Sequence, residues 1–399
     1  MIPYQGRYGK ACVMLNELND QNTISQIYGF LNHPAFTNPV SIMPDCHYGK
    51  GTVIGFTMEM TDMIIPNIVG VDINCGMLSL FLGPNALEKL SKEDIDYQIR
   101  QKIPLSTNIH KDPSMIHIVM HDSFWERSSE IHTIFTSEYN KRYGTKYQPT
   151  NYNMKWLEEK CKQINMNFER CLRSVGTLGG GNHFLELGKL VNKKEYLFTI
   201  HSGSRQFGLK ICDYWQRKAG GKTLSYLTGD DMFGYLTDMV FAQHYAQANR
   251  DAMAIIVLNV FDMECNDMIE TSHNFIDFRD FIIRKGAIRS YKGEEVVIPF
   301  NMEDGLLICE GKSNPEWNYS APHGAGRISS RSSIKKKMKQ TSSQELIKER
   351  MKNKGIYTSL VPLDETKEAY KDPKIIEEAI APTATIIDRA IPVLNIKAI

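Results

Sequence analysis

The chain has 399 residues, more than one ordinary domain needs, so its length allows one elaborate domain or two interlocked ones. Lys and Arg (47 residues) nearly balance Asp and Glu (46), so any nucleic-acid surface must be a local patch and cannot arise from overall charge. The eight cysteines form no CxxC pair, and no apolar run approaches the roughly 18 residues of a membrane span, which predicts a soluble, cytoplasmic protein in a reducing compartment, with no membrane association.

Short apolar segments bounded by Gly, Pro and Asp predict strands over residues 53–58, 77–83, 196–201, 254–261 and 304–311. Helical stretches are expected over 85–102, where Asn85 can act as the N-cap, and over 153–174 and 235–253. The polar, turn-rich segment 138–153 predicts a surface excursion. Together these elements indicate a fold that mixes α and β.

Five short stretches crowd polar residues with glycine beside predicted strands. Loops at strand ends are where binding and catalytic residues concentrate, so the five predict one convergent site. In the last stretch, glycines leave the imidazole of His323 room to act as a base, a metal ligand or a nucleophile. The stretches are MPDCHYGKG from Met43, VGVDINCGM from Val69, LGGGNHFLEL from Leu178, HSGSRQFG from His201 and SAPHGAGRISSR from Ser320.

Two of these stretches offer metal ligands. Asp72 and Cys75 are three residues apart in a glycine-bounded turn, where a carboxylate and a thiolate can face one ion. For a lone DxxC, a turn with a buried cysteine is the commoner explanation. His183 is flanked by Asn182 and Glu186, which are suited to a nucleobase or ribose, although a structural glycine turn explains this stretch equally well.

The remaining histidines extend the set of candidate ligands. His201 follows a predicted strand, and Ser202, Ser204 and Arg205 beside it favour phosphate binding. His273 alone is more often solvated or satisfied in a core. Taken together, one aspartate, one cysteine and three histidines suit Mn²⁺ or Zn²⁺, and a thiolate can bridge two ions. The residues themselves thus indicate a metal-assisted phosphoryl-transfer enzyme.

The motifs, taken in their order along the chain, resemble those of a known protein family. VGVDINCGM, GGGNHFLEL, HSGSRQFG, SHNF and HGAGRISSR resemble the motifs of the RtcB family of RNA-splicing ligases, and the similarity extends from MPDCHYGKG to the terminal IKAI. The resemblance implies a single large α+β domain over 1–399, with mixed or antiparallel sheets around a central metal cleft. It also implies GTP-dependent joining of RNA 3′-phosphate or 2′,3′-cyclic phosphate ends to 5′-hydroxyl ends, in RNA repair or tRNA splicing.

The resemblance also assigns roles to residues. His323 would be the nucleophile that carries GMP. Two Mn²⁺ ions would be bound, with Cys75 bridging them. One ion would also contact His201 and His273, and the other Asp72 and His183. Contacts to GTP are implied for Asn182, His183, Phe184, Leu185, Glu186, Asn274, Met302, Gly324, Ala325, Gly326, Tyr370 and Lys397.

The chain also departs from the family pattern, which indicates a divergent branch, one that we expect to serve RNA repair. PFNM (299–302) stands where relatives have a Pro-Gly-Ser-Met stretch, and Leu306 replaces an expected serine. We therefore expect GTP to remain preferred over ATP but to bind more weakly, with Leu306→Ser partly restoring affinity. Cys46 and Lys50 beside Asp45 are further differences in the first motif.

RNA contacts are expected from Arg205, Arg327 and Arg331, together with the lysine run at 334–339. A solvated helix face explains that run equally well. Two other functions remain open from the sequence: a metal-dependent RNA phosphoesterase without nucleotidylation, and a noncatalytic RNA-binding relative. Whether a protein partner activates the enzyme is not encoded in any motif.

Overall fold

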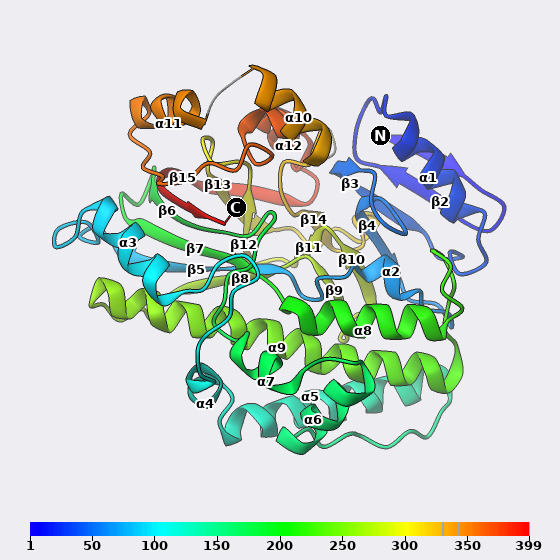
Figure 1. Ribbon diagram of the computed structural model, residues 1–399. Helices are drawn as coiled ribbons and strands as arrows, with labels where there is room; N and C mark the ends of the chain where they lie inside the picture. Colours follow the sequence, from blue (N-terminus) through cyan, green and yellow to red (C-terminus); the bar gives the residue numbers. More distant parts are fainter. Residues whose placement is uncertain (329–330, 342–343, 399) are drawn as a thin grey trace.

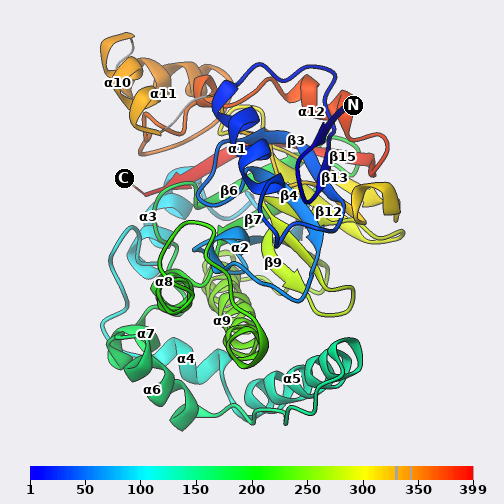
Figure 2. The same cartoon turned by 90° about the vertical axis from the view of Figure 1, so that its right-hand side faces the viewer.

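The computed structural model describes residues 1–328, 331–341 and 344–398. Two mainly antiparallel sheets form the middle of the molecule, with a thick layer of helices beneath them and a smaller group of helices above (Figure 1). The view turned by 90° in Figure 2 has the same layering, with α10 and α11 above the sheets and α5, α6 and α7 below them. The fold is α+β, as predicted.

The larger sheet has seven strands among the described residues, in the order β12-β13-β15-β6-β7-β5-β8, and every neighbouring pair is antiparallel. The predicted strands over 77–83, 196–201 and 304–311 are confirmed as β5, β7 and β13. The strands are β5 (Gly76–Gly83), β6 (Phe184–Leu190), β7 (Tyr196–Ser202), β8 (Met268–Ser272), β12 (Glu295–Pro299), β13 (Leu306–Gly311) and β15 (Ala384–Lys397).

The smaller sheet has the strand order β1-β2-β3-β4-β10-β9, in which β2 and β3 are parallel and the other pairs antiparallel. Its β4 confirms the strand predicted over 53–58, and a short pair, β11 with β14, lies beside it. The strands of this sheet are β1 (Ile2–Gln5), β2 (Lys10–Val13), β3 (Val40–His47), β4 (Ile54–Glu59), β9 (Asn274–Asp277) and β10 (Ile282–Lys285), and the separate pair is β11 (Ala287–Arg289) and β14 (Ser320–Pro322).

The lower helical layer is built around α9 (Gly229–Phe261), a helix of 33 residues. The strand predicted over 254–261 is wrong, because this apolar run is the last part of α9. There Val257 and Phe261 pack against Leu185 and Phe198 of the sheet. A helix buried on most sides is apolar around its whole circumference, so a short window of it has no periodicity that distinguishes it from a buried strand.

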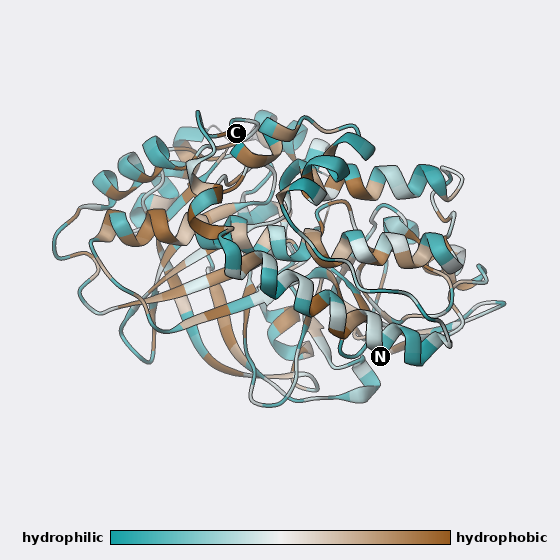
Figure 3. Cartoon of the chain, turned by 90° about the horizontal axis from the view of Figure 1, so that it is seen from below, coloured by the Kyte–Doolittle hydropathy of each residue, from teal (hydrophilic) through white to brown (hydrophobic). Residues whose placement is uncertain are grey.

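Other helices cover α9 and the smaller sheet. Figure 3, seen from below, shows hydrophobic residues along the strands and mixed hydrophilic and hydrophobic residues along the helices. No helix in the described part of the chain is long and apolar enough to cross a membrane. These helices are α1 (Gln21–Leu31), α2 (Pro66–Val69), α3 (Lys92–Lys102), α4 (Ser114–Val119), α5 (Asp122–Tyr143), α6 (Met154–Gln163), α7 (Phe168–Arg173) and α8 (Arg205–Lys218).

Two helix boundaries differ from the sequence expectation. The predicted cap at Asn85 is wrong: α3 begins after Ser91, whose side chain accepts a hydrogen bond from the backbone N–H of Asp94. Asn153 does cap α6, but the stretch 153–174 is divided into α6 and α7. Segment 138–153 begins as the end of α5 and is mostly exposed, with Tyr139 and Tyr152 buried in the core.

The upper group contains α10 (Arg331–Thr341), α11 (Gln344–Asn353) and α12 (Pro373–Ala379). Ile334 and Met338 of α10 pack with Ile347 and Met351 of α11 in a small apolar cluster. Met302, which follows β12, belongs to the same cluster. This packing attaches α10 and α11 to the turn between β12 and β13.

Candidate active site

The register of four neighbouring strands brings the predicted metal ligands together. Asp72 and Cys75 lie in the turn before β5, His183 precedes β6, His201 lies in β7, and His273 lies between β8 and β9. Residue 184 pairs with His201, and Gly76 pairs with both residues 202 and 272. Residues more than a hundred positions apart in the chain therefore meet at one end of the larger sheet.

The ligand atoms form two groups that share Cys75. In the first group, His183 Nε2 lies 2.8 Å from Asp72 Oδ2 and 3.4 Å from Cys75 Sγ. In the second, His201 Nε2 lies 3.2 Å from Cys75 Sγ and 3.3 Å from His273 Nε2. Within each group the candidate ligand atoms lie within 4.8 Å of one another. The partition matches the one that the resemblance implies.

The chemistry of these groups fits a divalent cation. The Leu178 carbonyl lies 2.8 Å from His183 Nδ1 and can accept a hydrogen bond from its N–H, which leaves the lone pair on Nε2. Burial lowers the pKa of His201 and His273 well below the usual histidine range, so both are neutral ligands. Burial also raises the pKa of the Cys75 thiol, and a nearby cation is what would stabilise its thiolate.

Asp72 is the ionised member of the set. Burial would raise its pKa, but the hydrogen bond and charge interaction with His183, and then the charge of Arg205, lower it below the usual aspartate value. A carboxylate, a thiol and three imidazoles suit Mn²⁺ or Zn²⁺ better than Mg²⁺, which prefers oxygen ligands. The residues present therefore fit a site for one or two borderline divalent ions.

His323 lies beside this cluster, with its ring centroid 4.8 Å from that of His273. Its Nδ1 lies 2.5 Å from Oδ2 of Asp45, a fully buried residue of β3, and the same oxygen accepts a hydrogen bond from the His323 backbone N–H at 3.1 Å. The carboxylate favours the tautomer with hydrogen on Nδ1, so the lone pair lies on Nε2. In the sequence, Asp45 stood out only as a member of the MPDCHYGKG stretch, with no signal that it orients His323.

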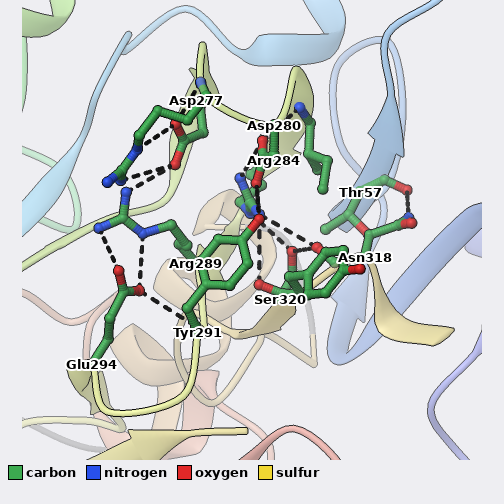
Figure 4. Close-up of polar contacts among 12 residues, drawn as sticks. Thr57, Asp277, Asp280, Arg284, Arg289, Tyr291, Glu294, Asn318 and Ser320 are labelled. Atoms are coloured by element: carbon green, nitrogen blue, oxygen red, sulfur yellow. Dashed lines mark hydrogen bonds and ion pairs between the residues drawn. The ribbon is translucent and has the colours of Figure 1, made fainter. Parts of the chain in front are cut away.

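A polar network supports the loop that carries His323. Figure 4 shows Arg284, which is fully buried, donating hydrogen bonds to Ser320 Oγ at 2.8 Å and to Asp280 Oδ2 at 2.9 Å. The Tyr291 hydroxyl donates to the same Asp280 oxygen at 2.8 Å. Ser320 begins β14, which pairs with β11 and ends immediately before His323. The network therefore fixes the strand from which the histidine projects.

A cavity of about 270 Å³ opens beside His323 and is lined by most of the residues expected to contact a nucleotide. Phe184 and Glu186 line it, whereas Leu185 between them points into the opposite core, because successive side chains of a strand alternate between its faces. His183 faces the metal-ligand cluster instead. The expected residues that do line the cavity are Asn182, Phe184, Glu186, Asn274, Met302, Gly324, Ala325, Gly326, Tyr370 and Lys397.

The divergent stretch has a different role from the one expected. Leu306 does not line the cavity: it is buried in an apolar cluster with Met77, Phe81 and Phe184. Asn301 lines the cavity, but its side chain is used within its own turn. Its amide donates to Asp304 Oδ2 at 2.7 Å, and its oxygen accepts from two backbone N–H groups. The expectation that Leu306→Ser restores a nucleotide contact is therefore wrong.

The three arginines expected at RNA are not equivalent. Arg327 and Arg331 line the cavity and bind the carboxylate of Glu365, which no motif had indicated. Arg205 lies behind the glycine loop, where it donates to Thr177 Oγ1 and to the Ser106 carbonyl, both at 3.1 Å. Arg205 is thus placed to support the loop before His183.

The lysine run lies on α10. Lys335, Lys336 and Lys339 are exposed, while Ile334 and Met338 are buried against α11. This amphipathic pattern is compatible with either of the two explanations that the sequence allowed.

Comparison with known proteins places this geometry in context. A family model described as tRNA-splicing ligase RtcB matches residues 26–398. The chain belongs to the RtcB family. It is 28% identical to the RNA-splicing ligase RtcB of Escherichia coli over 78% of this chain and 79% of that protein. The tRNA-splicing ligases RtcB of Methanococcus maripaludis and Nanoarchaeum equitans are 25% and 26% identical and cover 90% and 96% of the chain, which spans 87% and 93% of them. These low sequence identities confirm that the chain is a divergent member of the RtcB family.

Proposed function

We propose that the protein is an RNA ligase that uses GTP to join a 3′-phosphate or 2′,3′-cyclic phosphate end to a 5′-hydroxyl end. The observation that carries the proposal is the pair of His323 and Asp45 at the junction of the cavity and the metal-ligand cluster. A metal-dependent phosphoesterase needs the metal ligands, but it does not need a histidine whose tautomer is fixed by a buried carboxylate. The names of the relatives support RNA as the substrate.

Two Mn²⁺ ions would be held by the cluster, one by Asp72, Cys75 and His183 and the other by Cys75, His201 and His273. When bound, such ions neutralise negative charge that develops on phosphate oxygens. Cys75 would contact both ions. The bond-making steps of the proposed reaction use side chains of the protein itself.

In the first step, Nε2 of His323 attacks the α-phosphate of GTP. A nitrogen–phosphorus bond forms, the bond to the bridging oxygen breaks, and pyrophosphate leaves. Asp45 accepts the hydrogen bond from Nδ1, holds the ring in place and stabilises the positive charge that the ring acquires. The base of GTP would lie against Phe184 and Tyr370, with Glu186 and Lys397 at its edge.

In the second step, an oxygen of the RNA 3′-phosphate attacks the GMP phosphorus and the bond to Nε2 breaks, which regenerates neutral His323. The 5′-hydroxyl of the other strand then attacks the activated 3′-phosphate, loses its proton, and releases GMP. A cyclic end is first hydrolysed: water attacks its phosphorus and the bond to the 2′-oxygen breaks, which leaves a 3′-phosphate and a 2′-hydroxyl. Phosphate contacts along the strand would come from Arg331 and the exposed lysines of α10, and such contacts do not select a base sequence.

A ligation assay tests this proposal. RNA strands with a 3′-phosphate and a 5′-hydroxyl are incubated with the protein and Mn²⁺, with and without GTP, and a joined product that depends on GTP is expected. Release of the 3′-phosphate without joining, and without a need for nucleotide, would favour the metal-dependent phosphoesterase. Comparing the rate of joining of a cleaved tRNA with that of an unrelated broken RNA distinguishes tRNA splicing from RNA repair. A cytoplasmic location stays a prediction.

A further inference from the structure

Glu365 lies behind the cavity wall, and its carboxylate accepts from four side chains, although the residue belongs to none of the five motifs. Its side chain is fully buried, and each of its oxygens accepts two hydrogen bonds or ion pairs. Oε1 is contacted by Arg327 at 3.0 Å and by Arg331 at 2.7 Å. Oε2 accepts from Lys397 at 2.8 Å and from the Tyr370 hydroxyl at 2.6 Å.

All four donors line the cavity, whereas Glu365 itself does not. Three of them carry positive charge, so the carboxylate neutralises part of a concentrated cationic group away from solvent. Burial would raise the pKa of Glu365, but Lys397 and Arg331 lower it to about 2. The carboxylate is therefore a permanent anion that fixes the orientation of the cavity wall behind it.

The hydrogen-bond directions that Glu365 imposes have a consequence for a bound base. The Tyr370 hydroxyl donates its only hydrogen to Glu365 and accepts from Arg327 at 3.4 Å, so it has no hydrogen left to donate to a ligand. Lys397 donates one N–H to Glu365 and has two more. Beside it, the carboxyl group of Glu186 lines the same wall. The wall therefore presents fixed N–H donors at Lys397, next to a carboxyl group that accepts with both oxygens only when it is ionised.

We propose that Glu365 is a positioning residue that sets the preference for guanine over adenine by holding the Lys397 ammonium group in place. The proposal rests on the proposed function, in which GTP is the nucleotide donor. Guanine has a carbonyl acceptor where adenine has an amino donor, so a fixed N–H at this point favours guanine and opposes adenine. Glu365 acts through Lys397 and touches neither the base nor the reacting phosphate.

A buried carboxylate can also act simply as a structural tie, and Glu303 provides a matched control for that role. Its side chain is 2% exposed and it binds two cationic residues of the upper helical group, Arg350 at 2.5 Å and Lys354 at 2.8 Å. Glu303 does not line the cavity and contacts none of the four donors around Glu365. Replacing either glutamate by glutamine removes one buried charge of the same kind.

The test measures formation of the protein–nucleotide adduct against GTP and ATP concentration for wild type, Glu365→Gln and Glu303→Gln. For Glu365→Gln we expect the GTP concentration at half-maximal rate to rise about tenfold, the preference for GTP over ATP to fall about tenfold, and the maximal rate to change by less than about threefold. Glu303→Gln should lower the melting temperature without altering the nucleotide preference. Unchanged GTP dependence and preference in Glu365→Gln would overturn the inference.

A double-mutant comparison tests whether the effect passes through Lys397. In a Lys397→Met background, Glu365→Gln should change the nucleotide preference by less than about twofold, because residues acting as one unit are not additive. Full additivity would overturn the positioning role. If Glu365→Gln does not fold, Glu365→Asp keeps the charge with a shorter reach and should shift the preference in the same direction, and an unchanged preference would contradict the inference.

Binding of nonhydrolysable GTP and ATP analogues is measured by calorimetry on the same proteins. This readout tests Glu365 without any adduct: wild type should prefer the GTP analogue, and Glu365→Gln should lose most of that preference. Absence of an adduct in the wild type, with the analogue preference intact and dependent on Glu365, would count against the proposed function alone.

Discussion

At the scale of single residues, one buried carboxylate decides which nitrogen of His323 can react. Asp45 and His323 are 278 positions apart, and their contact depends on β3 and β14 lying side by side. The MPDCHYGKG and HGAGR stretches could each be recognised as chemically able in the sequence, but nothing in either indicated that one orients the other. Glu365 was missed for the same reason, since its partners are distributed over residues 327–397.

Asp45→Asn should slow adduct formation by about a hundredfold or more, because the amide favours the wrong tautomer of His323 and cannot stabilise a positive ring. The volume of the side chain is preserved, so the melting temperature should change little. The rate of adduct formation with saturating GTP measures the effect, and His323→Ala gives the background. A rate within threefold of wild type, roughly the scatter of such effects, would show that Asp45 does not set the reactivity of the imidazole.

Glu186 should make GTP binding depend on pH. Burial raises the pKa of its carboxyl to about 8, although Lys397 opposes the shift, so the free site is mostly protonated at neutral pH. An ionised carboxylate accepts from two guanine N–H groups with both oxygens, whereas a protonated carboxyl has a hydroxyl hydrogen that opposes one of them. Binding therefore releases a proton and strengthens as pH rises, by up to tenfold per unit below about pH 8, and levels off above it. Calorimetry with a GTP analogue from about pH 6 to about pH 8.5 tests this. Glu186→Gln should bind weakly and without this pH dependence, and a flat wild-type profile would contradict the prediction.

At the scale of elements, the sequence predictions of secondary structure were correct where a short apolar run is a buried strand. Strands β4, β5, β7 and β13 were identified because short apolar runs end in Gly, Pro or Asp. The end of α9 was mistaken for a strand because its surroundings, helices on one side and a sheet on the other, bury most of its circumference. Leu306 was placed at the nucleotide because its position in the family pattern was known, whereas its direction across β13 was not.

Leu306→Ser should destabilise the protein without improving GTP binding. The side chain is 1% exposed and packs with Met77 and Phe81, so the change leaves a cavity and buries an unpaired hydroxyl, at a cost of about 3 kcal/mol. Denaturant unfolding measures the loss, and the GTP dependence of adduct formation measures affinity. A lower GTP requirement in the variant would mean that position 306 reaches the nucleotide after all.

The exposed lysines of α10 should contribute to RNA affinity. Replacing Lys335, Lys336 and Lys339 by alanine should weaken binding of single-stranded RNA and reduce its salt dependence, by about 0.7 in the logarithmic slope for each lost phosphate contact. Fluorescence anisotropy at several salt concentrations measures both. Lys155→Ala with Lys162→Ala on α6, on the opposite side of the molecule in Figure 1, is the control. Equal RNA affinity in the two variants would show that the lysines of α10 form a solvated helix face and do not contact RNA.

At the scale of the whole molecule, the site joins both sheets and the chain's C-terminal strand. The metal-ligand cluster lies at one end of the larger sheet, Asp45 comes from the smaller sheet, and Lys397 lies in the last strand. Binding at this junction should therefore stabilise the entire fold, because a ligand that binds only the folded state shifts the unfolding equilibrium.

Mn²⁺ should raise the melting temperature by a few degrees, and Mg²⁺ should raise it less because thiolate and imidazole ligands disfavour it. Cys75→Ala should abolish most of this increase, and Asp72→Ala a smaller part, because Cys75 belongs to both ligand groups. Thermal unfolding with and without each metal measures the effect, and calorimetry counts the binding events. Two undiminished Mn²⁺ binding events in Cys75→Ala would exclude a bridging thiolate.

The central claim is that His323 becomes covalently attached to GMP. Its most direct test is incubation of the protein with Mn²⁺ and GTP labelled at the α-phosphate, followed by digestion and mass spectrometry of the labelled peptide. We expect one guanylyl group, bound to His323, lost in acid as a nitrogen–phosphorus bond is, and absent when the label is on the γ-phosphate. Label on another residue, or no covalent label in protein that binds Mn²⁺ and a GTP analogue, would contradict the account.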